Sequence, residues 1–194
     1  MSYNKDNNDI EDELPYKQEL NFTKGDNFYI YGDVDESFPK NIIAPFIELV
    51  DKKVKESNPT PINFHISSPG GFVQYCFDLI SWIEYAKSKD IVINTYVTSV
   101  AYSCASIIAV TGTRRWVSKR SQFLLHFARS WDFSHNPEMS DRNKASHDFM
   151  QNEIIEVYKK YSKLKDIRKK MMSDNFYILG GDELIKTGFA DELL

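Results

Sequence analysis

Apolar positions in the middle of the chain alternate between two kinds of spacing. Steps of three and four residues, typical of amphipathic helices, extend over 41–55 and 72–87. Short apolar or alternating runs that are typical of strands lie around these helices, at 28–31, 62–66, 91–97, 115–117 and 123–125. The small-residue and apolar segment 101–110 is typical of a buried helix. This order predicts an α/β fold with mainly parallel strands, in which each helix crosses back over one sheet.

The two ends of the chain differ from this middle part. Toward the C-terminus, helical spacing predicts a long helix over 143–161 and a short helix over 182–187 that ends at Gly188. The first 20 residues are rich in Asn, Asp and Glu and contain few apolar side chains. We therefore expect a flexible acidic N-terminal tail over 1–20, followed by a single domain over 21–194.

Composition excludes several classes of protein. Apolar residues make up 42% of the 194 positions, enough for one hydrophobic core, and the net charge of −4 gives no basic surface for nucleic acid or an anionic membrane. No apolar run approaches the roughly 20 residues that span a bilayer, and the acidic start is unlike a secretory signal. Cys76 and Cys104 form no CxxC pair and no metal-like cluster with histidine. We expect a cytoplasmic protein without a cofactor, a metal, a nucleic-acid partner or a membrane partner.

Three segments follow predicted strands, where open α/β sheets bind their ligands. The first is the loop 68–71, Ser-Pro-Gly-Gly, which follows the strand 62–66. Its paired glycines permit backbone conformations that would let N–H groups face a developing negative charge. The alternative is an ordinary turn between a strand and a helix, and the loop by itself favours that alternative.

The second segment places Ser103 at the start of the predicted helix 101–110. Backbone N–H groups in the first turn of a helix lack partners and favour negative charge, so the N–H of Cys104 could contribute to an oxyanion hole. The alternative is a serine that only caps the helix, which is common. Cys104 itself is a second candidate nucleophile beside a histidine-dependent site.

The third segment ends in His126, which directly follows the predicted strand 123–125. An imidazole with an ordinary pKa of about 6.5 can act as a general base near neutral pH. A lone histidine more often serves a structural or surface role, and we assign that role to His65, His135 and His147. A Gly-Gly loop, a serine at a helix start and a histidine at a strand end follow one another in this order. Together they indicate a catalytic site more strongly than each segment does alone.

These segments resemble motifs of the Clp protease proteolytic subunit family. The loop is similar to the family's Asn-Ser-Pro-Gly-Gly, 101–105 to its Ala-Ala-Ser-Met-Gly nucleophile segment, and 123–126 to its strand ending in the catalytic histidine. Further matches are Asp174-Asn-Phe-Tyr, which resembles an Asp-x-aromatic stretch, and 187–191, which resembles Tyr-Gly-Leu-Val-Asp. The resemblance implies a ClpP/crotonase-like fold of repeated ββα units with a long handle-like helix.

The resemblance also implies a serine endopeptidase and the roles of its residues. Ser103 is the expected nucleophile, His126 its base, and Asp174 the residue that orients the imidazole. The backbone N–H groups of Gly71 and Cys104 are the expected oxyanion hole. Peptide hydrolysis would then proceed through an acyl-enzyme, with Cys104 contributing its backbone and not its thiol.

The third residue of the triad has competitors in the sequence. Asp132, Asp141 and Asp166 also follow His126. Asp132 lies in an aromatic patch, and Asp166 lies in a charged run that is typical of a solvated surface. Asp174 is preferred because of its Asp-x-Phe setting and its distance from the C-terminal motif.

Partners follow from the resemblance as well. It implies peptide or unfolded-protein substrates and a homo-oligomeric ring, a heptamer that in the family stacks as a tetradecamer. The segment 129–150 lacks the family's Gly-rich strand, which in the family helps to join two rings. Both a single ring and a double ring therefore stay open as alternatives. The acidic segment 1–16 replaces the family's hydrophobic-tipped loop, so an AAA+ unfoldase also stays open as a partner.

Three alternatives to a general peptidase remain. The chain could be a catalytically inactive ring subunit, because the residues around the nucleophile differ from the family pattern. It could be a specialised processing protease, which would suit the unusual terminus. A crotonase-like enzyme acting on thioesters would share the sheet and the oxyanion hole, but such enzymes usually carry glutamates, so Ser103 and His126 speak against it.

Overall fold

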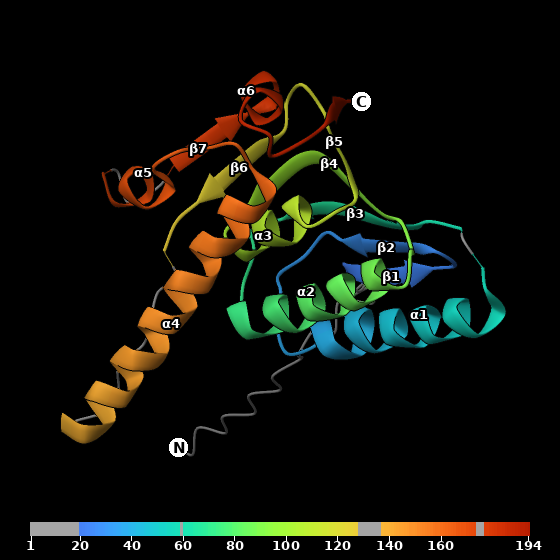
Figure 1. Ribbon diagram of the computed structural model, residues 1–194, viewed down its shortest axis with the longest axis horizontal. Helices are drawn as coiled ribbons and strands as arrows, with labels where there is room; N and C mark the ends of the chain where they lie inside the picture. Colours follow the sequence, from blue (N-terminus) through green and yellow to red (C-terminus); the bar gives the residue numbers. More distant parts are fainter. Residues whose placement is uncertain (1–19, 59, 128–136, 174–176) are drawn as a thin grey trace, which may run out of the picture.

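The computed structural model describes residues 20–58, 60–127, 137–173 and 177–194. Within that part of the chain, one eight-stranded sheet is flanked by helices (Figure 1). The strands are β1 (Asn21–Lys24), β2 (Asn27–Ile30), β3 (Ile62–Ser68), β4 (Ile93–Tyr102), β5 (Arg114–Val117), β6 (Gln122–Leu125), β7 (Tyr177–Gly180) and β8 (Glu192–Leu193). The helices are α1 (Ala44–Glu56), which continues the π-helical turn η1 (Pro39–Ile43), α2 (Val73–Ser88), α3 (Cys104–Val110), α4 (Pro137–Tyr161), α5 (Ile167–Ser173) and α6 (Gly181–Lys186).

Strand β4 organises the sheet. The strands follow the order β1-β2-β3-β4-β5-β8, and β4 pairs with β5 along 94–97 and with β6 along 100–102. Every pair is parallel except β1–β2 and β6–β7. The predicted α/β fold with mainly parallel strands is confirmed, and the carboxyl ends of β3, β4 and β6 therefore lie at one edge.

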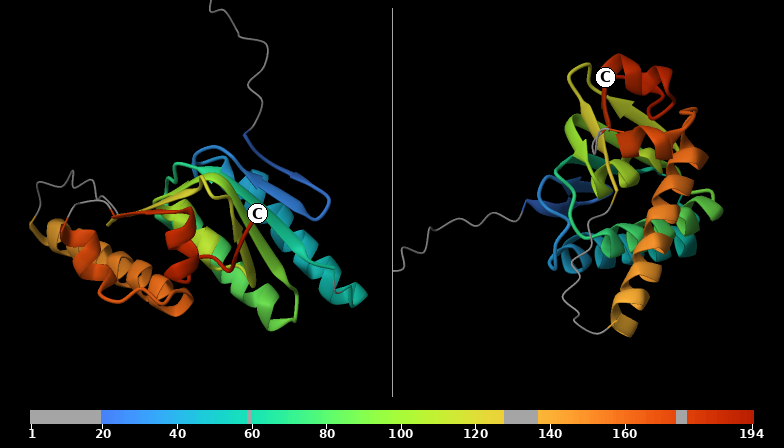
Figure 2. Two further views of the ribbon diagram at one scale, coloured as in Figure 1. Left: turned by 90° about the horizontal axis from the view of Figure 1, so that it is seen from above. Right: turned by 90° about the vertical axis from the view of Figure 1, so that its left-hand side faces the viewer.

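Alternation along β3 produces two different faces of the sheet. Ile62, Phe64 and Ile66 are buried, whereas Asn63 and His65 between them are half-exposed. The buried side faces the helices, because the ring of Phe64 contacts that of Phe46 from α1 at a centroid distance of 5.2 Å. Helices α1, α2 and α3 lie on this same side (Figures 1 and 2). Complete burial of each such side chain contributes about 1.5–3 kcal/mol, so this face contains the main core.

The long predicted helix is present as α4, which projects away from the sheet (Figure 1). Its C-terminal half packs on the core through Ile154, Ile155 and Tyr158, which are at most 2% exposed. Phe149 lies earlier in the same helix and is 63% exposed. Some of the apolar residues that predicted the helix therefore do not pack on the core of this chain. The handle-like helix of the predicted fold is thus confirmed.

Two predicted boundaries were wrong by several residues. The long helix expected over 143–161 begins at Pro137. The strand expected over 91–97 continues to Tyr102, and the helix expected over 101–110 begins at Cys104. The cause is β6, which pairs with Val100, Ala101 and Tyr102 and extends β4 beyond its contact with β5. Ser103 consequently lies at the junction of a strand and a helix and not inside a helix. The predicted tail lies outside the described residues except for Leu20, so it stays a prediction.

Candidate active site

Ser103 occupies a strained turn between β4 and α3. Its backbone angles are φ 54° and ψ −130°, a conformation that side-chain-bearing residues rarely adopt. Such strain costs of order 1–3 kcal/mol and is concentrated at functional sites. The side chain makes no hydrogen bond that caps α3, so the simple capping role does not account for this serine.

The pairing of β4 with β6 brings Ser103 near His126. Tyr102 is in register with Leu124, and the Ser103 N–H donates a 2.8 Å hydrogen bond to the Leu124 carbonyl. His126 follows the last residue of β6, so it leaves the sheet at the edge where Ser103 leaves it. Both residues line one pocket of about 470 Å³, together with Gly71 and residues of α2 and α4. Ser103 and His126 are each half-buried there.

The Gly70-Gly71 loop is fitted closely between two other segments. A Cβ atom on Gly70 would lie 2.6 Å from the Tyr102 carbonyl oxygen and 2.8 Å from the Ser103 Cβ. A Cβ atom on Gly71 would lie 2.3 Å from the Val34 carbonyl oxygen, and both glycines have positive φ angles of 94° and 152°. Hydrogen bonds from Val34 N–H to the Gly70 carbonyl and from Phe72 N–H to the Val34 carbonyl hold the loop. The loop is therefore more than a turn into α2, because its backbone forms a wall beside Ser103.

Two backbone N–H groups are candidates for binding a developing oxyanion. Cys104 is the first residue of α3, where a helix has no intrahelical acceptor for the N–H. Gly71 lines the pocket that contains Ser103. Cys104 is 1% exposed. Its backbone carbonyl accepts a 3.2 Å hydrogen bond from the Cys76 thiol. Burial raises the pKa of the Cys76 thiol well above its ordinary value, so that sulfur does not resemble a reactive thiolate.

A comparison with protein families decides what kind of protein this site belongs to. The family model described as Clp protease matches residues 14–194. The chain belongs to the Clp protease family. The match spans the whole described sheet and includes the segments that contain Gly71, Ser103 and His126. A direct search of curated proteins finds no match to the chain.

Family membership confirms the resemblance and the fold, and it makes a peptidase the broad class of function. Clp proteases generally form oligomeric rings and act on protein substrates. In the described part of this Clp protease, no helix is long and apolar enough to cross a bilayer. No group of three or more potential metal-ligating His, Cys, Asp or Glu side chains occurs in the described ranges either.

The candidates for the third triad residue are only partly described. Asp174 and Asp132 lie outside the described residues, and Asp141 belongs to the part of α4 whose side chains are not described. Asp166 precedes α5 and lines a separate pocket that does not include Ser103. Asp166 is therefore not among the residues that line the Ser103 pocket.

Sequence reasoning missed two acidic residues of the Ser103 pocket. Asp33 and Asp35 line it, and they follow β2 at the same sheet edge as the other candidates. The Asp35 carboxylate accepts hydrogen bonds from the N–H and the hydroxyl of Ser37, which order this turn. The sequence could have indicated these two residues, because they follow the predicted strand 28–31 and ligands bind at the carboxyl ends of such strands.

Proposed function

We propose that this Clp protease is a serine endopeptidase whose nucleophile is Ser103. The observation that carries the proposal is the strained turn at Ser103, which lines one pocket with His126 and lies against the Gly70-Gly71 backbone. A serine on a sharp turn between a strand and a helix presents its hydroxyl at the top of a sheet, as in other hydrolases with this kind of turn.

The proposed reaction has two halves. In the first, the Ser103 hydroxyl oxygen attacks the peptide carbonyl carbon while His126 takes the hydroxyl proton. The carbonyl oxygen becomes an oxyanion that accepts hydrogen bonds from the N–H groups of Gly71 and Cys104. His126 then gives the proton to the leaving amine as the C–N bond breaks, which leaves an acyl-enzyme.

In the second half, water replaces the amine. His126 takes a proton from water, the hydroxide oxygen attacks the ester carbon, and the proton returns to Ser103 as the acid product leaves. We assign to Asp174 the role of holding the imidazole in the productive tautomer and stabilising its charged form. Sequence order and the Asp-x-Phe setting support that assignment over the other aspartates.

The proposal extends to the assembly and the cellular setting of the protein. We infer a homo-oligomeric ring, a heptamer, that cleaves peptides or unfolded proteins. The acidic segment 1–20 would form a flexible tail, and free Cys76 and Cys104 suit a reducing cytoplasm. The proposal leaves open whether two rings stack and whether an AAA+ unfoldase is a partner.

The decisive experiment labels the purified protein with a fluorophosphonate and measures peptide hydrolysis in parallel. Ser103→Ala should abolish labelling and lower the hydrolysis rate by at least about 10³-fold, and His126→Ala should do nearly the same. Ser81→Ala on the exposed surface of α2 is the matched control and should leave both unchanged. Labelling of Ser103→Ala at the wild-type level would refute Ser103 as nucleophile.

The same assay separates the alternatives. A folded wild-type ring that neither labels nor hydrolyses would identify an inactive subunit, and binding of a coenzyme A thioester without labelling would favour the crotonase-like alternative. Asp174→Asn should lower the rate by about 10⁴-fold if it orients the imidazole. Asp166→Asn and Asp132→Asn are the matched comparisons, and a larger loss in either would transfer the role to that residue.

A further inference from the structure

Two buried hydroxyl groups lie directly behind the candidate nucleophile and have no part in the proposed reaction. Ser106 in the first turn of α3 is completely buried, and Tyr158 of α4 is 1% exposed. The Ser106 Oγ lies 2.6 Å from the carbonyl oxygen of Ser103, and the Tyr158 hydroxyl oxygen lies 2.7 Å from the Ser106 Oγ. A continuous chain of hydrogen bonds thus runs from α4 to the backbone of Ser103.

The direction of these hydrogen bonds follows from counting protons. A carbonyl oxygen only accepts, so Ser106 donates its single hydroxyl proton to Ser103. The Ser106 oxygen must then accept, and Tyr158 is the donor. Burial raises the pKa of Tyr158 far above its ordinary value, which keeps the phenol protonated as this role requires. A donor that polarises the Ser106 hydroxyl strengthens the next hydrogen bond in the chain.

The anchored carbonyl shares a peptide unit with an N–H of the proposed oxyanion hole. The carbonyl of Ser103 and the N–H of Cys104 belong to one planar trans peptide, so they point in opposite directions. Ser103 O also accepts a 3.0 Å hydrogen bond from the Ser106 N–H. Two donors of Ser106 therefore hold the carbonyl inward, one of them backed by Tyr158, and the Cys104 N–H is directed away from them.

Strain at Ser103 makes such an anchor necessary. The unusual φ and ψ angles of Ser103 set the orientation of the peptide that follows it. Residues in sparsely populated conformations keep them only where surrounding contacts over-determine them. Rotation of this peptide would turn the Cys104 N–H out of the hole while leaving the Ser103 side chain on the same residue.

We propose that Tyr158 and Ser106 are positioning residues that hold the Ser103–Cys104 peptide with its N–H in the oxyanion hole. The inference rests on the proposed peptidase function and extends it. It means that the packing of α4 against the core affects how well the oxyanion hole stabilises the transition state. Because Tyr158 is buried in the contact between α4 and the core, a shift of α4 would release the Ser106 hydroxyl and loosen the hole. Neither side chain touches the substrate.

The test compares Tyr158→Phe, which removes one oxygen atom and keeps the ring, with Tyr161→Phe on the same helix. Tyr161 bonds to the exposed Glu84 and lines a different pocket, so its variant controls for a lost tyrosine hydroxyl on α4. Tyr158→Phe and Ser106→Ala should each lower kcat about 10–100-fold with KM changed less than twofold, because an oxyanion donor acts in the transition state. The double variant should be no slower than Ser106→Ala, since both act through one carbonyl.

Affinity for a peptide aldehyde provides a second measurement. The aldehyde carbon accepts the Ser103 oxygen and forms a tetrahedral adduct, so its affinity should fall in parallel with kcat/KM in Tyr158→Phe and stay unchanged in Tyr161→Phe. An unchanged kcat in Tyr158→Phe, or a rise in KM alone, would overturn the inference. Melting temperatures measured for each variant identify any rate loss that comes from unfolding.

A further measurement separates this inference from the proposed function. If the wild type does not label with fluorophosphonate, the peptidase proposal fails, and amide hydrogen exchange then tests the anchor alone. Tyr158→Phe should accelerate exchange of the Ser106 amide, whose acceptor is the anchored carbonyl, while Tyr161→Phe should not. Equal exchange in both variants would show that Tyr158 does not hold the peptide.

Discussion

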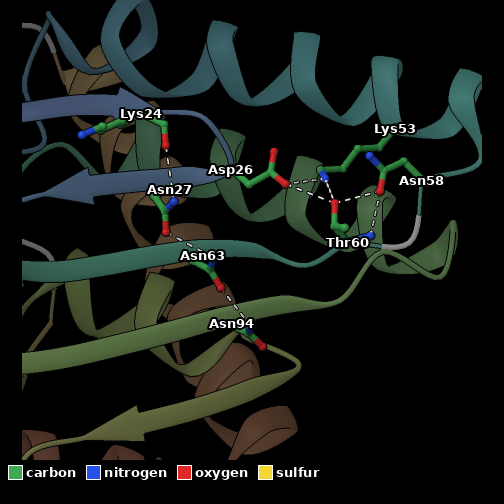
Figure 3. Close-up of polar contacts among 8 residues, drawn as sticks. All are labelled: Lys24, Asp26, Asn27, Lys53, Asn58, Thr60, Asn63 and Asn94. Carbon is green, nitrogen blue, oxygen red and sulfur yellow. Dashed lines mark hydrogen bonds and ion pairs between the residues drawn. The ribbon is translucent and has the colours of Figure 1, made fainter.

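The two ends of β3 and β4 are stabilised in opposite ways. At the carboxyl ends, main-chain geometry forms the candidate site, through the positive φ angles of Gly70, Gly71 and Ser103. At the amino ends, two groups of side-chain contacts tie the strands to each other and to α1 (Figure 3). The comparison teaches that the proposed chemistry at one end would depend on backbone conformation, whereas stability at the other depends on satisfied side chains.

The first group is an amide ladder across three strands. Asn94 donates to the Asn63 side-chain oxygen at 2.9 Å, and Asn63 donates to the Asn27 side-chain oxygen at 3.2 Å (Figure 3). Asn27, Asn63 and Asn94 are in register on β2, β3 and β4, so each carboxamide lies opposite the next. The Asn94 side-chain oxygen ends the ladder and is buried without a hydrogen-bond partner in the described part of the chain.

The second group is centred on a buried lysine of α1. The Lys53 side chain is 2% exposed, and its ammonium group donates to Asp26 at 2.7 Å and to the Thr60 hydroxyl (Figure 3). Asp26 lies in the turn between β1 and β2 and Thr60 in the connection from α1 to β3. The ion pair thus joins three segments near the amino ends of the strands. No part of it approaches the residues that line the Ser103 pocket.

The largest effect is expected from Gly71→Ala, which tests the dependence on backbone at the carboxyl end. The new Cβ would lie 2.3 Å from the Val34 carbonyl oxygen at a φ of 152°, so the loop must move. We expect loss of fluorophosphonate labelling and destabilisation by about 3 kcal/mol or more, measured by urea unfolding.

Gly25→Ala is the matched control for that variant. Gly25 also has a positive φ, of 59°, but a Cβ there would meet nothing within 4 Å. Only the conformational penalty of about 1 kcal/mol should remain, with labelling intact. If the two variants lost equal stability and both labelled normally, close packing of the Gly71 backbone would have no special role.

The next largest effect concerns the ion pair at the amino end. Asp26→Ala leaves the Lys53 ammonium buried with only Thr60 as a partner, and we expect destabilisation by about 2–3 kcal/mol, reduced because Asp26 is 36% exposed. Lys53→Met keeps the packed stem and removes the charge, so it should destabilise by about 1 kcal/mol. Labelling per folded molecule should stay at the wild-type level in both.

A surface pair provides the comparison for these variants. Lys159→Met breaks an exposed contact with Glu156 and should change stability by less than about 0.5 kcal/mol. Urea unfolding of the three variants gives their order. A smaller loss in Asp26→Ala than in Lys53→Met would mean that the buried ammonium finds another partner.

The fold could be predicted from the sequence wherever a segment buries one regular face. The spacing over 41–55 and 72–87 predicted α1 and α2, because both helices pack on the sheet through residues three and four apart. Helix α5 was missed because its two buried residues, Ile167 and Met171, lie among lysines that suggest a solvated surface. Strands β7 and β8 have four and two residues, and they exist through pairing with β6 and β5, which local spacing does not encode.

The site divides in the same way. Ser103 and His126 could be predicted as neighbours, because carboxyl ends of parallel strands meet at one edge. The backbone angles of Ser103 and the contact of Gly71 with Val34 could not, because they depend on segments distant in sequence. The hydrogen bond between Ser106 and Tyr158 joins residues 52 positions apart and has no local signature. Side-chain types at strand ends were predictable, whereas the conformations that orient them were not.

A smaller effect is expected when the amide ladder is interrupted. Asn63→Ala removes both ladder hydrogen bonds and leaves the Asn94 amide without its acceptor, so we expect destabilisation by about 1–2 kcal/mol. Asn94→Ala removes one of these bonds together with an unsatisfied buried oxygen, and should be milder. Urea unfolding measures both. The reverse order would show that the ladder does not act as a continuous unit.

The smallest effect is a pH dependence on the half-exposed face of the sheet, just beyond the amide ladder. The His65 ring stacks between Tyr29 and Tyr96 with centroid distances of 4.8 and 5.1 Å, and burial lowers the pKa of His65 below its ordinary value. The unfolded chain, with a histidine pKa of about 6.5, therefore binds the proton first as pH falls. Stability should decline as pH drops below about 6.5 and level off once the folded protein is protonated too. His65→Phe keeps a stacked ring and should reduce the dependence of the unfolding free energy on pH, measured by urea unfolding between about pH 5 and 8. An equal slope in the wild type and the variant would assign the pH dependence to other groups.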